Sequence, residues 1–254
     1  MTITLARQLV LEAARPYRRD GFGYGARHYY YFARGKLGLD PIYLAILERG
    51  FIVDSNRLLD LGCGQLLIAP LLAAARAKYE AGQWFAGWPA PPRDVQCHGI
   101  ELRPDVVRVA QQALGNLATV EIGDLTDASL PANDVTIMLD VMHYLSAAEQ
   151  VRLLERICDA LAPGGLFITR VADNRAGLSY WATHLGDQCV TFIRSLALGR
   201  PSWPRFHVRP LAEWCALLEH AGFNVETQSM SDGTPFANVM LIARRRGTVL
   251  RGHR

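Results

Sequence analysis

An apolar run ends in an acidic, glycine-containing turn near residue 60 of this 254-residue chain. Residues 58–64 read Leu-Leu-Asp-Leu-Gly-Cys-Gly. Glycines let a backbone pass close to a ligand, and open α/β sheets bind ligands at the carboxyl ends of their strands. A tight turn between a strand and a helix would also explain two glycines. The choice between a ligand-binding loop and a plain turn therefore depends on the residues that follow.

Acidic residues follow three further predicted strands. Glu101 ends the second, where a carboxylate can accept hydrogen bonds from both hydroxyls of a ribose, and Asp124 follows the third, where it suits an exocyclic amine. Asp140 follows the fourth. Because parallel strands present their carboxyl ends at one edge, we expect these three residues and Asp60 to converge on one crevice.

Short apolar runs alternate with longer amphipathic stretches from residue 57 onward, which is typical of β-α-β units. This pattern predicts an α/β fold with a doubly wound, mainly parallel seven-stranded sheet and a C-terminal antiparallel hairpin. The predicted strands are 57–61, 96–101, 119–122, 135–139, 166–171, 223–230 and 236–243. The predicted helices between them are 67–78, 104–114, 147–161 and 211–221, the third stopping at Pro163-Gly164-Gly165 and a turn.

This ordered set resembles the class I S-adenosylmethionine-dependent methyltransferase family over residues 57–171. The resemblance implies S-adenosylmethionine as cofactor, S-adenosylhomocysteine as product, and no metal. By it, Gly62 and Gly64 lie under the methionine part of the cofactor, Glu101 holds the ribose, and Asp124 faces the adenine. The implied cofactor-binding residues are Asp60, Gly62, Cys63, Gly64, Glu101, Leu102, Asp124, Leu125 and Asp140.

Two features depart from the family pattern. Leu66 stands where a third glycine is usual, which predicts a wider loop or a tighter cofactor pocket. The long distance from Asp60 to Glu101 is explained by a surface insertion over 82–93 that is rich in Trp, Gly and Pro. A nicotinamide enzyme is disfavoured. The dinucleotide fingerprint has three spaced glycines and an acidic residue about 20 positions later, whereas this chain lacks the third glycine and has Glu101 much later.

The chain is expected to form one elaborated domain, since half of its residues are hydrophobic and its length suits a single core. Helices are predicted at 5–14, 24–32 and 41–48. Its predicted parts are a helical lead-in (1–50), a cofactor-binding core (57–171), a substrate cap (172–210), a closing helix and hairpin (211–243) and a basic tail (244–254).

Methyl transfer is an in-line displacement in which the protein mainly positions the reactants and excludes water. A general base helps when the acceptor is a hydroxyl or an activated carbon, and His143, just past the fourth strand, is the first candidate; a structural histidine is the alternative. The candidate substrate-binding residues are Tyr30, Tyr31, His143, Trp181 and His184. For the aromatic run 29–32, packing of a helix on the core is the alternative.

Residues 31–37 and the pair Asp40-Pro41 resemble the helical lead-in of bacterial methyltransferases that accompany aryl-polyene and related fatty-acid-like pathways. This resemblance implies a hydroxyaryl or acyl acceptor, including a unit tethered to an acyl carrier protein. DNA is disfavoured, because the chain has no Asp-Pro-Pro-Tyr-like tetrapeptide and no Pro-Cys nucleophile. The alternatives are a catalytically silent binding or scaffolding protein on the same fold and an RNA methyltransferase.

The formal net charge is +3, but five of the 27 basic residues lie in 244–254. The rest of the chain is therefore not basic and gives no electrostatic case for binding nucleic acid. That tail is either a partner contact or a solvated terminus. Five widely spaced cysteines, no secretory signal and no apolar run long enough for a membrane span predict a soluble, cytoplasmic protein. The sequence does not predict the oligomeric state.

Overall fold

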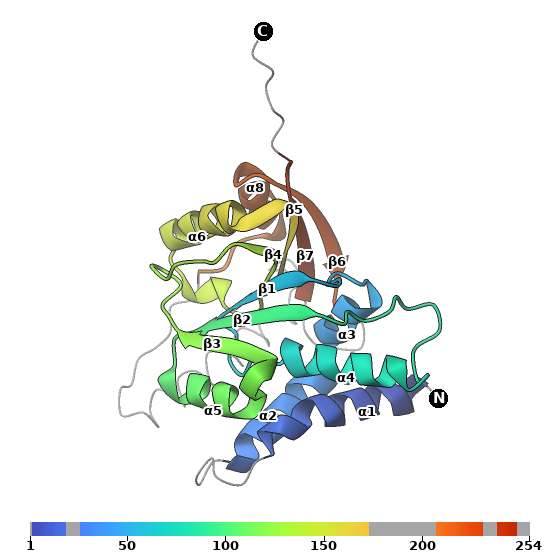
Figure 1. Cartoon of the computed structure of the whole chain (residues 1–254). Coiled ribbons are helices and arrows are strands. Elements are labelled where there is room, and N and C mark those ends of the chain that lie inside the picture. Colours follow the sequence, from blue (N-terminus) through green and yellow to red (C-terminus); the bar gives the residue numbers. More distant parts are fainter. Residues whose placement is uncertain (1, 19–25, 173–206, 231–237, 248–254) are drawn as a thin grey trace. The chain divides into compact units, whose positions relative to one another are not determined.

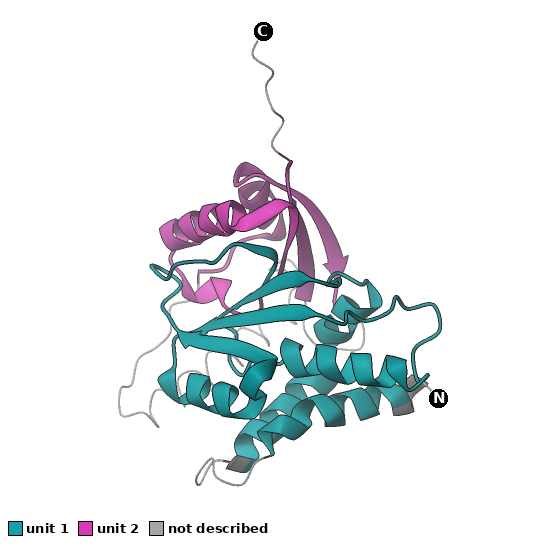
Figure 2. Cartoon of the chain, viewed as in Figure 1, with its two compact units in different colours: residues 1–137 teal, residues 138–254 magenta. Residues whose placement is uncertain are grey.

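The computed structural model describes residues 2–18, 26–172, 207–230 and 238–247. The chain divides into two compact units, residues 1–137 and residues 138–254 (Figure 2). Nearly all of the predicted substrate cap, 172–210, lies outside the described residues. The expectation of one elaborated domain stays a prediction.

The first unit is built on parallel strands. They are β1 (Asn56–Leu61), β2 (Val95–Glu101), β3 (Ala118–Ile122) and β4 (Asn133–Met138). The last residue of β4, Met138, is assigned to the second unit. Strand β1 pairs with β2 on one side and with β4 on the other, and β3 pairs with β2. All four lie within two residues of their predicted bounds, and in β1, β2 and β4 the buried residues cluster toward the carboxyl end.

Helices cover one face of strands β1 to β3 (Figure 1). The first unit contains α1 (Thr2–Ala14), η1 (Arg15–Tyr17), α2 (Ala26–Leu39), α3 (Pro41–Glu48), α4 (Ile68–Glu80), α5 (Pro104–Leu114) and η3 (Gly115–Leu117). Helix α1 packs on α4, and α2 packs on α1, so the N-terminal helices form a further layer. Asp40 caps α3 by accepting a hydrogen bond from the Ile42 N–H at 3.2 Å.

The segment 82–93 connects α4 to β2 without regular structure, as the sequence predicts for an insertion. Its aromatic rings pack on one another: Phe85 is buried and stacks on Trp88 with ring centroids 4.1 Å apart. The Trp84 indole N–H donates to the Pro89 carbonyl at 2.9 Å. The insertion lengthens the chain between β1 and β2 without breaking their pairing, which begins at Asn56 and Val95.

The second unit contains η4 (Met142–Tyr144), α6 (Ala147–Ala160), β5 (Leu161–Ala172), α8 (Leu211–His220), β6 (Phe223–Ser229) and β7 (Asn238–Arg245). Strand β7 runs antiparallel to both β5 and β6. The predicted turn at 163–165 is wrong, because α6 ends at Ala160 and β5 begins at the next residue. Gly164 has φ +76°, so the chain bends inside β5, and β7 pairs with β5 only from Leu166 onward.

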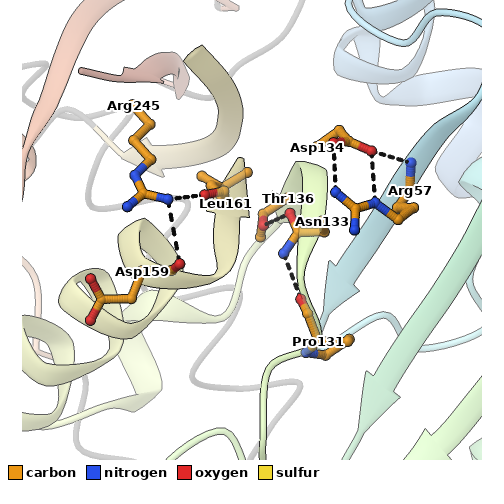
Figure 3. A network of polar contacts seen from close by, with 8 residues as sticks. All are labelled: Arg57, Pro131, Asn133, Asp134, Thr136, Asp159, Leu161 and Arg245. Atoms are coloured by element: carbon orange, nitrogen blue, oxygen red, sulfur yellow. Dashed lines mark hydrogen bonds and ion pairs between the residues drawn. The ribbon is translucent and has the colours of Figure 1, made fainter. Parts of the chain in front are cut away.

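The described strands form the seven-stranded, mixed and mainly parallel sheet that the sequence predicts, with antiparallel strands at its C-terminal end. Polar contacts stabilise the ends of several strands (Figure 3). Asn133 accepts from the Thr136 hydroxyl at 2.8 Å and donates to the Pro131 carbonyl at 3.0 Å, and Arg245 donates to the carbonyls of Asp159 and Leu161. In the described part of the chain, no helix combines the length and hydropathy that crossing a membrane requires.

Candidate functional site

A loop with a left-handed backbone follows β1. Gly62 has φ +66° and Gly64 has φ +54°, a conformation that glycine adopts without steric cost. The N–H groups of Gly62 and Cys63 donate to the Ile100 carbonyl on β2, at 2.8 and 3.1 Å. The loop is therefore attached to the neighbouring strand at its carboxyl end.

Leu66 continues this pattern, although it is not a glycine. Its φ is +55°, its N–H closes a turn on the Cys63 carbonyl at 2.8 Å, and its side chain is fully buried. One of its methyl groups lies 3.3 Å from where a β-carbon on Gly99 would stand. The missing third glycine thus changes the packing beneath the loop and keeps the left-handed backbone conformation.

Cys63 contributes its backbone to the loop, because its thiol faces β2. A β-carbon on Gly99 would lie 2.6 Å from the Cys63 sulfur, closer than real contacts allow, so the thiol takes the space that Gly99 leaves. Burial raises the pKa of Cys63 well above its ordinary value. The thiol is therefore a packing group at neutral pH.

The carboxylate of Glu101 joins the end of β2 to this loop. Glu101 is 5% exposed, and its Oε2 accepts the Gly64 N–H at 2.9 Å. Its Oε1 accepts the N–H of Arg103 at 3.0 Å and the Nε of the same residue at 2.8 Å. The Arg103 Nη2 lies 3.3 Å from Oε2.

Asp60 and Glu101 are two buried carboxyl groups with opposite shifts in pKa. Burial and the charge of Glu101 raise the pKa of Asp60 to about 8. Burial alone would also raise the pKa of Glu101, but the hydrogen bonds and charge of Arg103 and the Gly64 N–H lower it. At neutral pH the arrangement holds one ionised and one protonated carboxyl beside the glycine loop.

Strands β2 and β3 present exposed apolar side chains where they end. Leu102 is 60% exposed and Ile122 is 59% exposed, and Ile122 is paired with Glu101 in the strand register. Asp124 lies just beyond, and one of its oxygens accepts the N–H and hydroxyl of Thr126 at 2.9 and 2.8 Å. These bonds lower the pKa of Asp124. Leu125 is buried beside it.

Asp140 belongs to the second unit and is engaged there in an ion pair. Its φ is +59°, and its Oδ1 accepts the Arg170 Nε at 2.9 Å, with a second contact between Arg170 Nη2 and Oδ2. The Arg170 side chain is 7% exposed, so Asp140 supplies the charge partner of a buried guanidinium. Its predicted contact with the cofactor stays a prediction.

His143 lies in the turn η4 and is half-buried. Its ring packs against Tyr144 with centroids 4.2 Å apart, and its carbonyl accepts the His207 N–H at 2.9 Å. The fully buried Gln150 fixes this turn: its Nε2 donates to the carbonyls of Met142 and Leu145 at 3.0 and 3.2 Å. The turn that carries His143 is thus anchored on α6.

The predicted aromatic substrate residues differ in their surroundings. Tyr30 lies under the Arg18 guanidinium, 5.9 Å from the ring centroid, and Tyr31 is 58% exposed. Trp181 and His184 lie outside the described residues. The described residues contain no cluster of three potential metal ligands.

Sequence reasoning missed three residues that support the loop. Arg103 was visible two positions after Glu101, next to the helix-starting Pro104, and could have been paired with it. Tyr17 gives no sequence signal, yet its buried hydroxyl donates to the Gln65 carbonyl at 2.7 Å. Gln65, which is 3% exposed, donates to the Tyr29 carbonyl at 3.3 Å. The N-terminal elements η1 and α2 therefore contact the chain just after the glycine loop, at Gln65.

A family model described as a methyltransferase domain matches residues 29–228. A ubiquinone biosynthesis O-methyltransferase from Xylella fastidiosa (strain 9a5c) is 27% identical over 210 residues, which cover 79% of this chain and 74% of that protein.

Solved structures share the fold. An O-methyltransferase family protein from Burkholderia thailandensis matches 91% of this chain with a TM-score of 0.60 and 18% identity. This chain spans 63% of that protein, less than two thirds of its length. The magnesium protoporphyrin IX methyltransferase from Synechocystis with bound SAH matches with a TM-score of 0.54 and 18% identity, covering 92% of this chain and 93% of that one.

Proposed function

The chain belongs to the methyltransferase domain family, as its sequence motifs predict, and we propose that it transfers a methyl group from S-adenosylmethionine to a hydroxyl oxygen of a small hydroxyaryl acceptor. The methyltransferase from Synechocystis has SAH bound, the product that remains when S-adenosylmethionine has given up its methyl group. This supports S-adenosylmethionine as the methyl donor. The names of the Xylella and Burkholderia proteins, both O-methyltransferases, support oxygen as the acceptor atom.

The contact between Gly64 and Glu101 is the observation that carries this proposal. It brings a buried carboxylate, an acceptor for ribose hydroxyls, next to a loop whose glycines let the methionine part approach the backbone. Asp60, Gly62, Cys63 and Gly64 would hold the methionine part, the last two through their backbone. These groups fit the cofactor because a charged acceptor and an open backbone lie side by side.

The ends of β2 and β3 fit the adenine. Leu102 and Ile122 expose apolar surface that a flat ring would cover, and burying it favours binding. The second carboxylate oxygen of Asp124 would accept from the exocyclic amine, while its first oxygen holds Thr126. Leu125 would close the pocket beneath the ring.

The bound cofactor supplies an electrophilic methyl group on a sulfonium. The chain's own contribution is to align the acceptor oxygen, exclude water and remove the hydroxyl proton. His143 is proposed as the general base, because Gln150 fixes its turn and an imidazole nitrogen can accept a proton from a hydroxyl. An acyl unit on a carrier protein is the second acceptor class to test. The residues proposed to bind the acceptor are Tyr30, Tyr31, Trp181 and His184.

The cofactor site is tested by calorimetric titration of S-adenosylmethionine and S-adenosylhomocysteine into the wild type, Glu101→Gln and Asp134→Asn. Glu101→Gln keeps the side-chain shape but removes the charge that accepts two hydroxyls, so we expect affinity to fall by roughly 100-fold. Asp134→Asn, on β4, should bind like the wild type. No binding to the wild type would reject the proposed function and favour a scaffolding protein.

The general base is tested by turnover with hydroxyaryl and carrier-bound acyl compounds in the wild type and His143→Gln. We expect kcat of the variant to fall by at least about 100-fold while the affinity for S-adenosylhomocysteine stays unchanged, because the histidine acts on the acceptor. An unchanged kcat would assign His143 a structural role.

A further inference from the structure

Every acceptor position of the Glu101 carboxylate is in use within the chain. Oε1 accepts two N–H groups of Arg103, at 3.0 and 2.8 Å, and Oε2 accepts the Gly64 N–H at 2.9 Å and the Arg103 Nη2 at 3.3 Å. A carboxylate offers about four lone-pair directions. A ribose that donates two hydroxyl groups to Glu101 therefore has to replace two of these bonds.

The Arg103 side chain holds the two bonds that can be given up. Its backbone N–H and that of Gly64 belong to strand-end and loop positions that are fixed by Pro104 at the start of α5 and by the loop's attachment to Ile100. The Arg103 side chain, in contrast, is 41% exposed, whereas the Glu101 side chain is 7% exposed. Water already reaches the Arg103 guanidinium, so it remains solvated when it separates from Glu101. Breaking an ion pair with one partly exposed partner costs little free energy once the ribose hydroxyls replace its bonds.

We propose that the Arg103 side chain is a displaceable latch on Glu101, which the two ribose hydroxyls of the cofactor replace. This inference rests on the proposed function. It makes Arg103 a positioning residue: its side chain orients the buried carboxylate, whose charge the backbone N–H groups of Gly64 and Arg103 also stabilise. It sets a threshold for binding that only a ligand with both hydroxyls passes at full affinity. A ligand without them leaves the two Arg103 bonds in place and gains no contact with Glu101.

The test measures dissociation constants of S-adenosylhomocysteine and its 2′,3′-dideoxy analogue, at about pH 7, for the wild type and Arg103→Met. Methionine keeps much of the side-chain volume and cannot donate to Glu101. We expect Arg103→Met to bind S-adenosylhomocysteine roughly threefold to tenfold more tightly, the effect of a partly exposed ion pair, and to bind the analogue as the wild type does. In turnover, KM for S-adenosylmethionine should fall while kcat stays unchanged.

Arg108→Met is the matched control, because Arg108 is exposed on α5, the helix that follows Arg103, and the hydrogen bonds to Glu101 in the described part of the chain come from Gly64 and Arg103. It removes the same charge and should leave both dissociation constants unchanged. An equal gain in Arg108→Met, an equal gain for the analogue, or weaker binding by Arg103→Met would overturn the latch while leaving the cofactor site in place. Failure of the wild type to bind either ligand would overturn the proposed function and the latch together.

Discussion

The two ends of strand β1 carry charged groups in opposite situations. At its amino end, Arg57 pairs with Asp134 of β4 through two side-chain hydrogen bonds of 3.0 and 2.9 Å, and the Arg57 side chain is 46% exposed (Figure 3). At its carboxyl end, Asp60 is buried beside a second carboxyl group, Glu101. The amino end joins opposite charges that water reaches, and the carboxyl end buries two carboxyl groups, of which one is ionised and the other protonated at neutral pH.

This difference separates a paired, partly exposed charge from a buried carboxyl group on the same strand. The Arg57 pair lowers the pKa of Asp134, as expected for a carboxylate with a cation beside it. At the carboxyl end, burial and the charge of Glu101 raise the pKa of Asp60, and Leu66 in the loop that follows has a left-handed backbone conformation. Unfavourable local arrangements of this kind are common where a ligand is to be bound.

Truncation of Leu66 should produce the largest change in stability. Leu66→Ala removes a fully buried side chain and should lower the free energy of unfolding by about 2–5 kcal/mol. Leu66→Gly leaves a similar cavity but relieves the left-handed strain, so it should be more stable than Leu66→Ala by about 1 kcal/mol. Urea unfolding of the three proteins measures both differences.

Leu71 on α4 provides the matched control, because it is equally buried but lies in a right-handed helix. There the order should reverse, with the glycine variant less stable than the alanine variant by about 1 kcal/mol. If glycine is worse than alanine at both positions, the left-handed conformation of Leu66 carries no strain.

Titration of Asp60 should make stability depend on pH. Its folded-state pKa of about 8 lies above the value of about 3.9 in an unfolded chain, so between them the folded protein holds the extra proton. The free energy of unfolding should therefore fall as pH rises, by at most about 1.4 kcal/mol per pH unit, and level off above the folded-state pKa. Urea unfolding at several pH values should show this slope in the wild type and not in Asp60→Asn, and parallel profiles would contradict it.

Loss of the pair at the amino end should have the smallest effect. Asp134→Asn should lower the free energy of unfolding by less than about 1 kcal/mol at neutral pH, because water already surrounds much of the Arg57 side chain. The lowered pKa of Asp134 means that this contribution disappears as pH falls and the carboxyl is protonated. A loss of several kcal/mol in urea unfolding would show that the two ends of β1 do not differ as described.

The sequence predicted the strands that end at the site, because buried apolar runs and glycines mark where β1 and β2 stop. It failed at β5, where Pro163-Gly164-Gly165 is a local signal for a turn but the strand continues through it. The pairing of Glu101 with Gly64 spans 37 positions, and no local pattern encodes it. The support from Tyr17 depends on how α1 and α2 pack, which side-chain types alone do not determine.

The buried hydroxyl of Tyr17 bears on where this protein can be shortened. The residues that match the family model begin at position 29, and a trimmed gene starting there would look complete by sequence comparison. It would lack α1 and the phenol beneath Gln65, leaving that carbonyl without its donor in a region closed to water. An expression plasmid for crystallisation or screening should therefore retain the first helix, although the matched residues do not include it.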